Sequence, residues 1–169
     1  MKIALLDDNP EQLERNQRFL NALPVEIVTA SLTAKTFLQE VKLSKPEILI
    51  LDLNLGDSYM TGMEVAHELK LPVLFASSNT PEYVKEMERL KREESLCVDH
   101  ITKPFTEQEF QKTLSRFLQE VTFFSNQSHV TLDLGKQKRI KLAVDSIVYL
   151  AADKASGSES NNKQIYFSN

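Results

Sequence analysis

Several features that mark large classes of protein are scarce in this chain of 169 residues. It has one cysteine, Cys97, so no disulfide can form within the chain, and this is typical of proteins in a reducing compartment. No apolar run approaches the roughly 20 residues needed to cross a bilayer. The N-terminal segment reaches Asp7 and Asp8 before a long apolar stretch could form, which argues against a signal peptide. We therefore expect a cytoplasmic protein that has no membrane partner.

The net charge is modestly negative, but it is distributed unevenly. A pI near 5.5 argues against a protein whose whole surface binds nucleic acid. Residues 1–120 hold 14 basic and 20 acidic side chains, a net of −6, whereas residues 121–169 hold 6 and 4, a net of +2. We predict two modules on this basis: a domain at residues 1–121, a linker at 122–128 and a smaller module at 129–169.

Residues 1–121 alternate between short apolar runs and helical periodicity. The runs predict strands at 3–6, 25–28, 48–51, 73–76 and 96–101, and the periodic segments predict helices at 10–23, 34–41, 62–71, 80–94 and 106–121. Parallel neighbours need a crossover, which the helices supply. The predicted fold class is α/β, a doubly wound five-stranded parallel sheet in the flavodoxin-like order 2-1-3-4-5, followed by a small β-rich segment.

Polar side chains follow four of the five predicted strands. They are Asp7 and Asp8 after the first, Asp52 after the third, Ser77 and Ser78 after the fourth, and Lys103 after the fifth. Ligands of such sheets bind beyond the carboxyl ends of the strands, so these residues are candidate site residues. Three converging carboxylates repel one another unless a cation compensates them, and Mg²⁺ prefers oxygen ligands of this kind. The lysine could pair with a phosphoryl oxygen.

This arrangement resembles the receiver domain of two-component response regulators over about residues 1–121. The resemblance rests on the acid pair Asp7-Asp8, the segment Ile48–Asn54, the segment Phe75–Ser78 and the segment Lys103–Phe105. It implies that the protein accepts a phosphoryl group rather than acting as an enzyme. It also implies a sensor histidine kinase as a partner and a homodimer formed through the helix 4, strand 5, helix 5 face. The Lys103-Pro104 bond is expected to be cis.

The resemblance also implies a role for each site residue. Asp52 would accept the phosphoryl group, Ser77 would move toward it and Lys103 would pair with it. The set that would hold Mg²⁺ is Asp8 directly, Asp7 mainly through water, Asp52, and Asn54 through its backbone carbonyl. Ser78 is close enough in sequence to replace Ser77 as the hydroxyl donor. The chemistry is positioning and charge neutralisation around an in-line transfer.

His100 departs from the family pattern, which usually has Tyr or Phe at that position of the fifth strand as a switch residue. Histidine is smaller and can ionise near neutral pH, so the size of the switch and its pH dependence stay open. A haloacid-type Mg²⁺-dependent phosphatase or phosphotransferase is an alternative, but that class needs an acid where this chain has Asn54. A flavodoxin-type binding module would need a glycine-rich phosphate loop, and the chain has only 4 glycines. A stand-alone receiver that acts through protein contacts is the remaining alternative.

The second module has the pattern of an all-β fold. Apolar alternation predicts strands at 129–134, 139–142, 147–150 and 164–167, with turns at Gly135-Lys136 and Asp145-Ser146 and a loop at 156–162. The order of these segments resembles the first part of a LytTR-type DNA-binding domain and covers under half of it. This implies transcription regulation, with DNA bound by the complete output domain. The basic residues that could contact phosphates are Lys136, Lys138, Arg139 and Lys141.

Overall fold

A computed structural model describes residues 1–56, 60–78, 80–126, 129–133, 139–143, 147–153 and 162–167. The chain divides into two compact units, Met1–Val121 and Thr122–Asn169. The strands of the first unit are β1 (Lys2–Leu6), β2 (Glu26–Ser31), β3 (Ile48–Leu51), β4 (Val73–Ser77) and β5 (Val98–Thr102). Its helices are α1 (Pro10–Leu20), α2 (Ala34–Ser44), α3 (Gly62–Leu69), α4 (Thr80–Glu93) and α5 (Glu107–Asn126). None of the helices so described is long and apolar enough to span a bilayer.

The five strands form one parallel sheet in the order β2-β1-β3-β4-β5, which confirms the predicted fold class. Leu5 of β1 pairs with Ala30 of β2 on one side and with Ile50 of β3 on the other. Strands β1 and β3 are parallel neighbours, so their carboxyl ends lie side by side. The strand order reverses between them. That edge is where a doubly wound sheet opens a crevice for a ligand.

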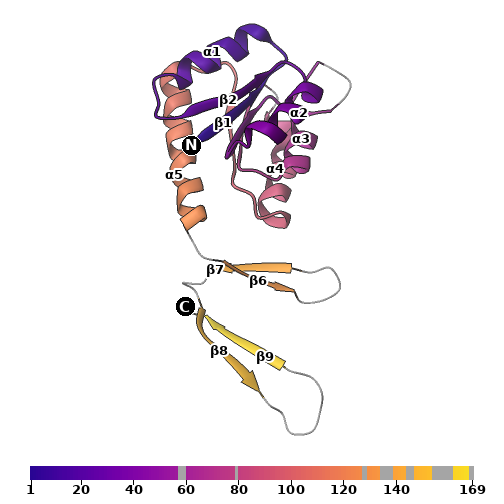
Figure 1. Cartoon of the computed structure of the whole chain (residues 1–169), viewed down its shortest axis with the longest axis vertical. Coiled ribbons are helices and arrows are strands. Elements are labelled where there is room, and N and C mark those ends of the chain that lie inside the picture. The colour runs from indigo at the N-terminus through magenta and orange to yellow at the C-terminus, as the bar shows by residue number, and fades with distance from the viewer. Residues whose placement is uncertain are drawn as a thin grey trace. The chain divides into compact units, whose positions relative to one another are not determined.

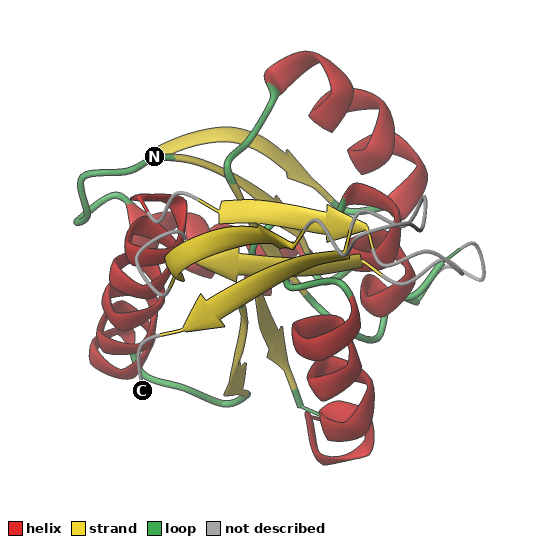
Figure 2. Cartoon of the chain, turned by 90° about the horizontal axis from the view of Figure 1, so that it is seen from below, coloured by secondary structure: helices red, strands yellow, loops and turns green. Residues whose placement is uncertain are grey.

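Two layers of helix cover the sheet, as the two views in Figures 1 and 2 show. Successive residues of a strand point to opposite faces, so Leu49 and Leu51 of β3 join the core under α2, α3 and α4. Ile48 and Ile50 join the core under α1 and α5. All four residues are buried, which explains the uninterrupted apolar run in the sequence.

Side-chain caps fix where three of the helices begin. Asn9 accepts hydrogen bonds from the backbone N–H groups of Glu11 and Gln12 at the start of α1. Thr61 with Glu64 forms a capping box at α3. Thr106 and Glu109 exchange the same pair of bonds at α5. The two loops that lead into α3 and α5 border the carboxyl edge of the sheet, so these caps help to place the candidate site.

Several boundaries differ by a few residues from those expected, and two of the differences have a clear physical reason. The first helix ends at Leu20, not at residue 23: Asn21 is its C-cap, and Pro24 disfavours helical backbone angles at Leu23, the residue directly before it. Residues 122–126, predicted as part of a linker, continue α5 as helix to Asn126. No glycine or proline interrupts residues 107–126, so the helix has no local reason to stop at residue 121.

The second unit contains two antiparallel hairpins. Strands β6 (His129–Asp133) and β7 (Arg139–Ala143) pair with each other, and β8 (Ile147–Asp153) pairs with β9 (Asn162–Phe167). These strands agree with the β-rich pattern expected for the segment. The predicted turns at 135–136 and 145–146, most of the loop at 156–162 and the basic residues Lys136 and Lys138 lie outside the described residues.

Candidate functional site

The carboxyl edge of the sheet brings one lysine into contact with two carboxylates. Asp7 follows β1, Asp52 follows β3 and Lys103 follows β5, where parallel strands place them at one edge. The Nζ atom of Lys103 donates to Oδ2 of Asp7 and to Oδ2 of Asp52, both at 2.7 Å. Asp7 is 2% and Asp52 9% exposed, so both residues are buried at the carboxyl edge of the sheet. Charge-assisted bonds of this length are among the strong ones in proteins.

Asp8 completes a cluster of three carboxylates. One oxygen from each of Asp7, Asp8 and Asp52 lies within 4.8 Å of the other two. Asp8 is exposed, and its Oδ2 accepts a hydrogen bond of 2.8 Å from the backbone N–H of Gly56. A Cβ atom on Gly56 would approach that oxygen to 2.7 Å, so the glycine leaves room for the carboxylate.

The donor set of this cluster fits a hard divalent cation. The cluster holds three carboxylates, and within the described part of the chain the ammonium of Lys103 contacts two of them, so this one positive charge does not balance theirs. All the ligand atoms offered are oxygens, which Mg²⁺ prefers over nitrogen and sulfur. Asp7, Asp8 and Asp52 are therefore the residues that could hold the ion.

The buried position of Asp7 affects its ionisation. Burial raises the pKa of the Asp7 carboxyl above its ordinary value, although the hydrogen bond and charge of Lys103 and the N–H of Asn9 act in the opposite direction. The nearby charge of Asp52 adds to the rise in pKa. The contact with Lys103 thus offsets only part of the desolvation cost of the Asp7 carboxylate.

Backbone contacts hold Asp52 in place. Its N–H donates to the carbonyl of Leu6 at 2.8 Å, and its Oδ1 accepts from the N–H of Asn54 at 3.3 Å. Gly62, the first residue of α3, packs directly against the Asp52 carbonyl. A Cβ atom on Gly62 would lie 1.9 Å from that oxygen, so only glycine fits there.

The two candidate hydroxyl residues differ in burial. Ser77 is the last residue of β4 and 1% exposed, and its carbonyl accepts from the N–H of Lys103 at 3.1 Å. Ser78 is exposed. Burial beside Lys103 therefore favours Ser77 over Ser78. The Lys103-Pro104 bond is cis, as expected.

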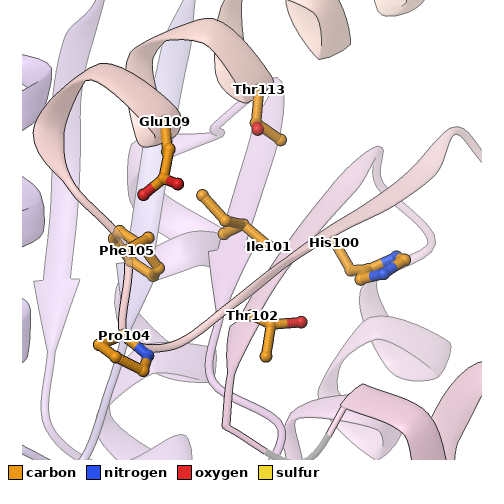
Figure 3. Close-up of a pocket in the computed structure, with 7 residues that line it drawn as sticks. All are labelled: His100, Ile101, Thr102, Pro104, Phe105, Glu109 and Thr113. Carbon is orange, nitrogen blue, oxygen red and sulfur yellow. The ribbon is translucent and has the colours of Figure 1, made fainter.

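His100 lies on β5 away from the carboxylates and is exposed. It borders an open groove of about 280 Å³ together with residues at the start of α5. Figure 3 shows its ring pointing away from Ile101, which faces Glu109 and Thr113 on α5. Neighbouring strand residues alternate between faces, so the His100 side chain is on the face of the sheet that α4 covers.

One contact at the site was not anticipated from the sequence. The hydroxyl of Tyr83 on α4 donates to Oδ1 of Asn54 at 3.0 Å. The two residues are 29 positions apart and belong to different crossover units. No periodicity, cap or turn pattern links them, so only the three-dimensional structure could find the pair.

Comparison with known proteins identifies the domain. A family model of the response regulator receiver domain matches residues 3–115. The chain belongs to this family. The comparison with curated proteins found no match to this chain. Phosphorylation on an aspartate and binding of Mg²⁺ at an acidic cluster are general to receiver domains, which are phosphorylated by sensor kinases.

Solved receiver domains share the fold of residues 1–121. The chemotaxis response regulator CheY4 of Vibrio cholerae is 22% identical with a TM-score of 0.57, covering 69% of this chain and 97% of that chain. The signal receiver domain of a putative Luxo repressor protein from Vibrio parahaemolyticus is 19% identical with a TM-score of 0.60, covering 73% and 94%. The isolated REC domain of RcsB from Salmonella enterica serovar Typhimurium, solved with the phosphomimetic BeF3−, is 20% identical with a TM-score of 0.58, covering 71% and 88%.

Proposed function

We propose that this receiver domain accepts a phosphoryl group on Asp52 from a sensor histidine kinase or a small phosphodonor. The observation that carries the proposal is the single ammonium of Lys103, 2.7 Å from carboxylate oxygens of both Asp52 and Asp7. An oxygen of a third carboxylate, that of Asp8, lies within 4.8 Å of oxygens of the other two. This combination provides a nucleophile, a fixed positive charge and a place for a divalent cation within one pocket.

The proposed transfer uses an oxygen of the Asp52 carboxylate as the nucleophile. A bond forms between this oxygen and phosphorus while the bond from phosphorus to the donor's nitrogen or oxygen breaks, and the donor leaves with that electron pair. Mg²⁺, when bound, neutralises negative charge on the phosphoryl oxygens. The hydrogen bond from the Asp52 N–H to the Leu6 carbonyl and the one from the Asn54 N–H to the Asp52 carboxylate orient Asp52, so little reorganisation precedes the transfer.

Other residues would complete the pocket. Asp8 would bind the ion directly, Asp7 mainly through water, and Asn54 through its backbone carbonyl. After the transfer, Lys103 would pair with one phosphoryl oxygen, and the Ser77 hydroxyl would donate a hydrogen bond to another phosphoryl oxygen. The ammonium already lies at the carboxylate that is to be modified, so it has only a short distance to move.

The test is phosphorylation by acetyl phosphate with Mg²⁺, followed by intact mass measurement. We expect one alkali-labile phosphoryl group, absent in Asp52→Ala. Asp99→Asn is the matched control, because Asp99 is a carboxylate on β5 that binds Arg116 at 2.6 Å, outside the pocket. An addition that survives Asp52→Ala, or no addition to the unmodified chain, would defeat the proposal.

The proposal treats the domain as a phospho-acceptor rather than as a phosphatase of the haloacid type. The residue two positions after Asp52 is Asn54, whose side-chain oxygen accepts from Tyr83. An amide cannot act as the general acid or base that this enzyme class needs. We expect added phosphoesters to remain unhydrolysed, and steady catalytic release of phosphate from them would favour the enzyme.

The output proposed is dimerisation followed by DNA binding. Phosphorylation would reorganise the face formed by α4, β5 and α5, with Ser77 and His100 as switch residues, and promote a homodimer. The hairpins β6–β7 and β8–β9 are compatible with the first part of a LytTR-type module, whose complete form would bind promoter DNA. Sedimentation with and without beryllofluoride tests the dimer, and a monomer under both conditions counts against it.

A further inference from the structure

A chain of two hydrogen bonds connects helix α4 to the carboxylate of Asp52. The Tyr83 hydroxyl donates to Oδ1 of Asn54 at 3.0 Å. The backbone N–H of the same asparagine donates to Oδ1 of Asp52 at 3.3 Å. We propose that Tyr83 is a positioning residue that couples the state of the Asp52 carboxylate to the position of α4. This inference rests on the proposed phosphorylation of Asp52.

Helix α4 is held loosely enough for such a bond to matter. Among its residues with described side chains, Met87 and Leu90 are buried, whereas Val84 is 41% exposed. Two large buried side chains give the helix a narrow apolar contact with the sheet. Elements with few buried apolar contacts open or shift at low free energy, so one polar bond has a large share of what holds them.

Polar contacts hold α4 near both of its ends. Just past its C-terminal end, Glu94 accepts from Nδ1 of His67 on α3 at 2.6 Å and lies 3.6 Å from the ammonium of Lys70. In its first turns, Tyr83 contacts the loop that follows β3. The end fixed by Glu94 is remote from the acceptor pocket, whereas the end fixed by Tyr83 connects to it. A change at Asp52 would therefore act on the N-terminal part of the helix.

Phosphorylation would directly alter the hydrogen bond between the Asn54 N–H and the Asp52 carboxylate. The carboxylate becomes an acyl phosphate, and its oxygens lose the full negative charge that makes them strong acceptors. The N–H of Asn54 then has a weaker partner, and the side chain that Tyr83 binds moves with its backbone. Coupling of this kind is reciprocal, so a partner that fixes α4 also favours one state of the pocket.

The coupling of Asp52 to α4 through Tyr83 is separate from any coupling through β5. The His100 side chain is exposed on the α4 face of β5, and its ring points away from Ile101, Glu109 and Thr113 of the open groove (Figure 3). Tyr83 instead reaches the residue two positions after Asp52 without an intermediate strand. Removing its hydroxyl leaves Ser77, Lys103 and the three carboxylates unchanged, so the two routes can be separated by experiment.

The test is hydrogen–deuterium exchange on the full chain, with and without Mg²⁺ and beryllofluoride, for the unmodified protein, Tyr83→Phe and Arg89→Gln. Fluorine NMR reports occupancy of the pocket in each sample. Arg89→Gln is the matched control, because Arg89 lies on the same helix and its described bonds are only to Glu86 and Glu93 within it. The phenylalanine keeps the ring and removes only the hydroxyl.

We expect beryllofluoride to change amide exchange in residues 84–93 of the unmodified protein and of Arg89→Gln. In Tyr83→Phe without beryllofluoride, these amides should exchange roughly 2- to 12-fold faster, as the loss of one hydrogen bond predicts. The further change on adding beryllofluoride should be largely lost. In an Asn54→Ala background, Tyr83→Phe should add nothing, because the two side chains act as one unit.

The outcomes separate this inference from the proposed function. If beryllofluoride occupies the pocket of Tyr83→Phe and α4 responds as in the unmodified protein, the coupling through Tyr83 is wrong while phosphorylation of Asp52 stands. If beryllofluoride binds to none of the proteins, the Asp52 proposal fails and the coupling fails with it. An Arg89→Gln variant that behaves like Tyr83→Phe would also overturn the inference, since any weakening of α4 would then suffice.

Discussion

Substituting Gly62 by alanine tests how closely α3 must approach the proposed acceptor. A Cβ atom at this position would lie 1.9 Å from the carbonyl oxygen of Asp52 and 2.8 Å from its carbonyl carbon. The atoms that it meets belong to the backbone and cannot rotate away. The loop between β3 and α3 must therefore shift, and the 3.0 Å bond from the Gly62 N–H to the Leu53 carbonyl is lost or weakened.

The expected loss of stability follows from three contributions. Overpacking costs about 1–3 kcal/mol, and the lost hydrogen bond costs about 1 kcal/mol. The better helix propensity of alanine returns about 0.5–1 kcal/mol. A net loss of about 1–3 kcal/mol should lower the Tm by roughly 4–12 °C for a unit of this size. Phosphorylation by acetyl phosphate should also slow, because Asp52 is displaced.

Gly56→Ala is the matched control for thermal unfolding, and Mg²⁺ titration of this variant also tests the role of Asp8. Its added Cβ would meet the carboxylate oxygen of Asp8 at 2.7 Å, at the far end of a flexible side chain. We expect a stability change within about 0.5 kcal/mol, together with weaker Mg²⁺ binding as Asp8 moves aside. If Gly62→Ala unfolded and reacted like the unmodified chain, the tight contact between α3 and Asp52 would be refuted.

Three further predictions concern charged groups. Lys103→Met should destabilise the metal-free protein by about 1–3 kcal/mol, measured by urea unfolding, and added Mg²⁺ should recover part of the loss; an unchanged midpoint would contradict the shared ion pair. The pKa of Glu109 is lowered by the hydrogen bonds that its carboxylate accepts from the N–H and hydroxyl of Thr106. The stability that these bonds contribute is present above the pKa that Glu109 has in the unfolded chain, and it is lost as the pH falls through the pKa in the folded protein. NMR titration of Thr106→Ala should show the pKa of Glu109 returned toward its ordinary value. Arg116→Ala should cost no more than about 1 kcal/mol in thermal unfolding, because the arginine that pairs with Asp99 is 67% exposed; a larger loss would show that this pair is structural.

The sequence predicted the sheet well because its signals are local. Residues 48–51 are four consecutive aliphatic residues that become a strand buried on both faces. The pairing of Thr106 with Glu109 was readable as a capping box and is present at α5. The convergence of Asp7, Asp52 and Lys103 also followed, because parallel strands end at one edge. These features depend on spacing and periodicity, which a single sequence contains.

Other features depend on contacts between distant segments. Nothing near Tyr83 indicates that its hydroxyl meets Asn54, because the bond joins two crossover units. Gly62 was readable as the start of a helix, but not as a residue pressed against the Asp52 carbonyl. The continuation of α5 to Asn126 was missed because the apolar stripe weakens after Val121, where Phe123 is 60% exposed. Tertiary approach decides such features, and helix propensity alone does not report it.

The charge balance of the pocket distinguishes it from a structural ion pair. A purely structural cluster would be expected to match its buried charges, since an uncompensated buried charge is costly. Here one ammonium is shared by Asp7 and Asp52, and Asp8 adds a third carboxylate whose described bond comes from a neutral backbone N–H. Burial also raises the pKa of Asp7 despite the contact with Lys103. The fold therefore supports an excess of negative charge at the strand ends, and that excess is explained if the pocket's working state includes a divalent cation that the chain itself does not supply.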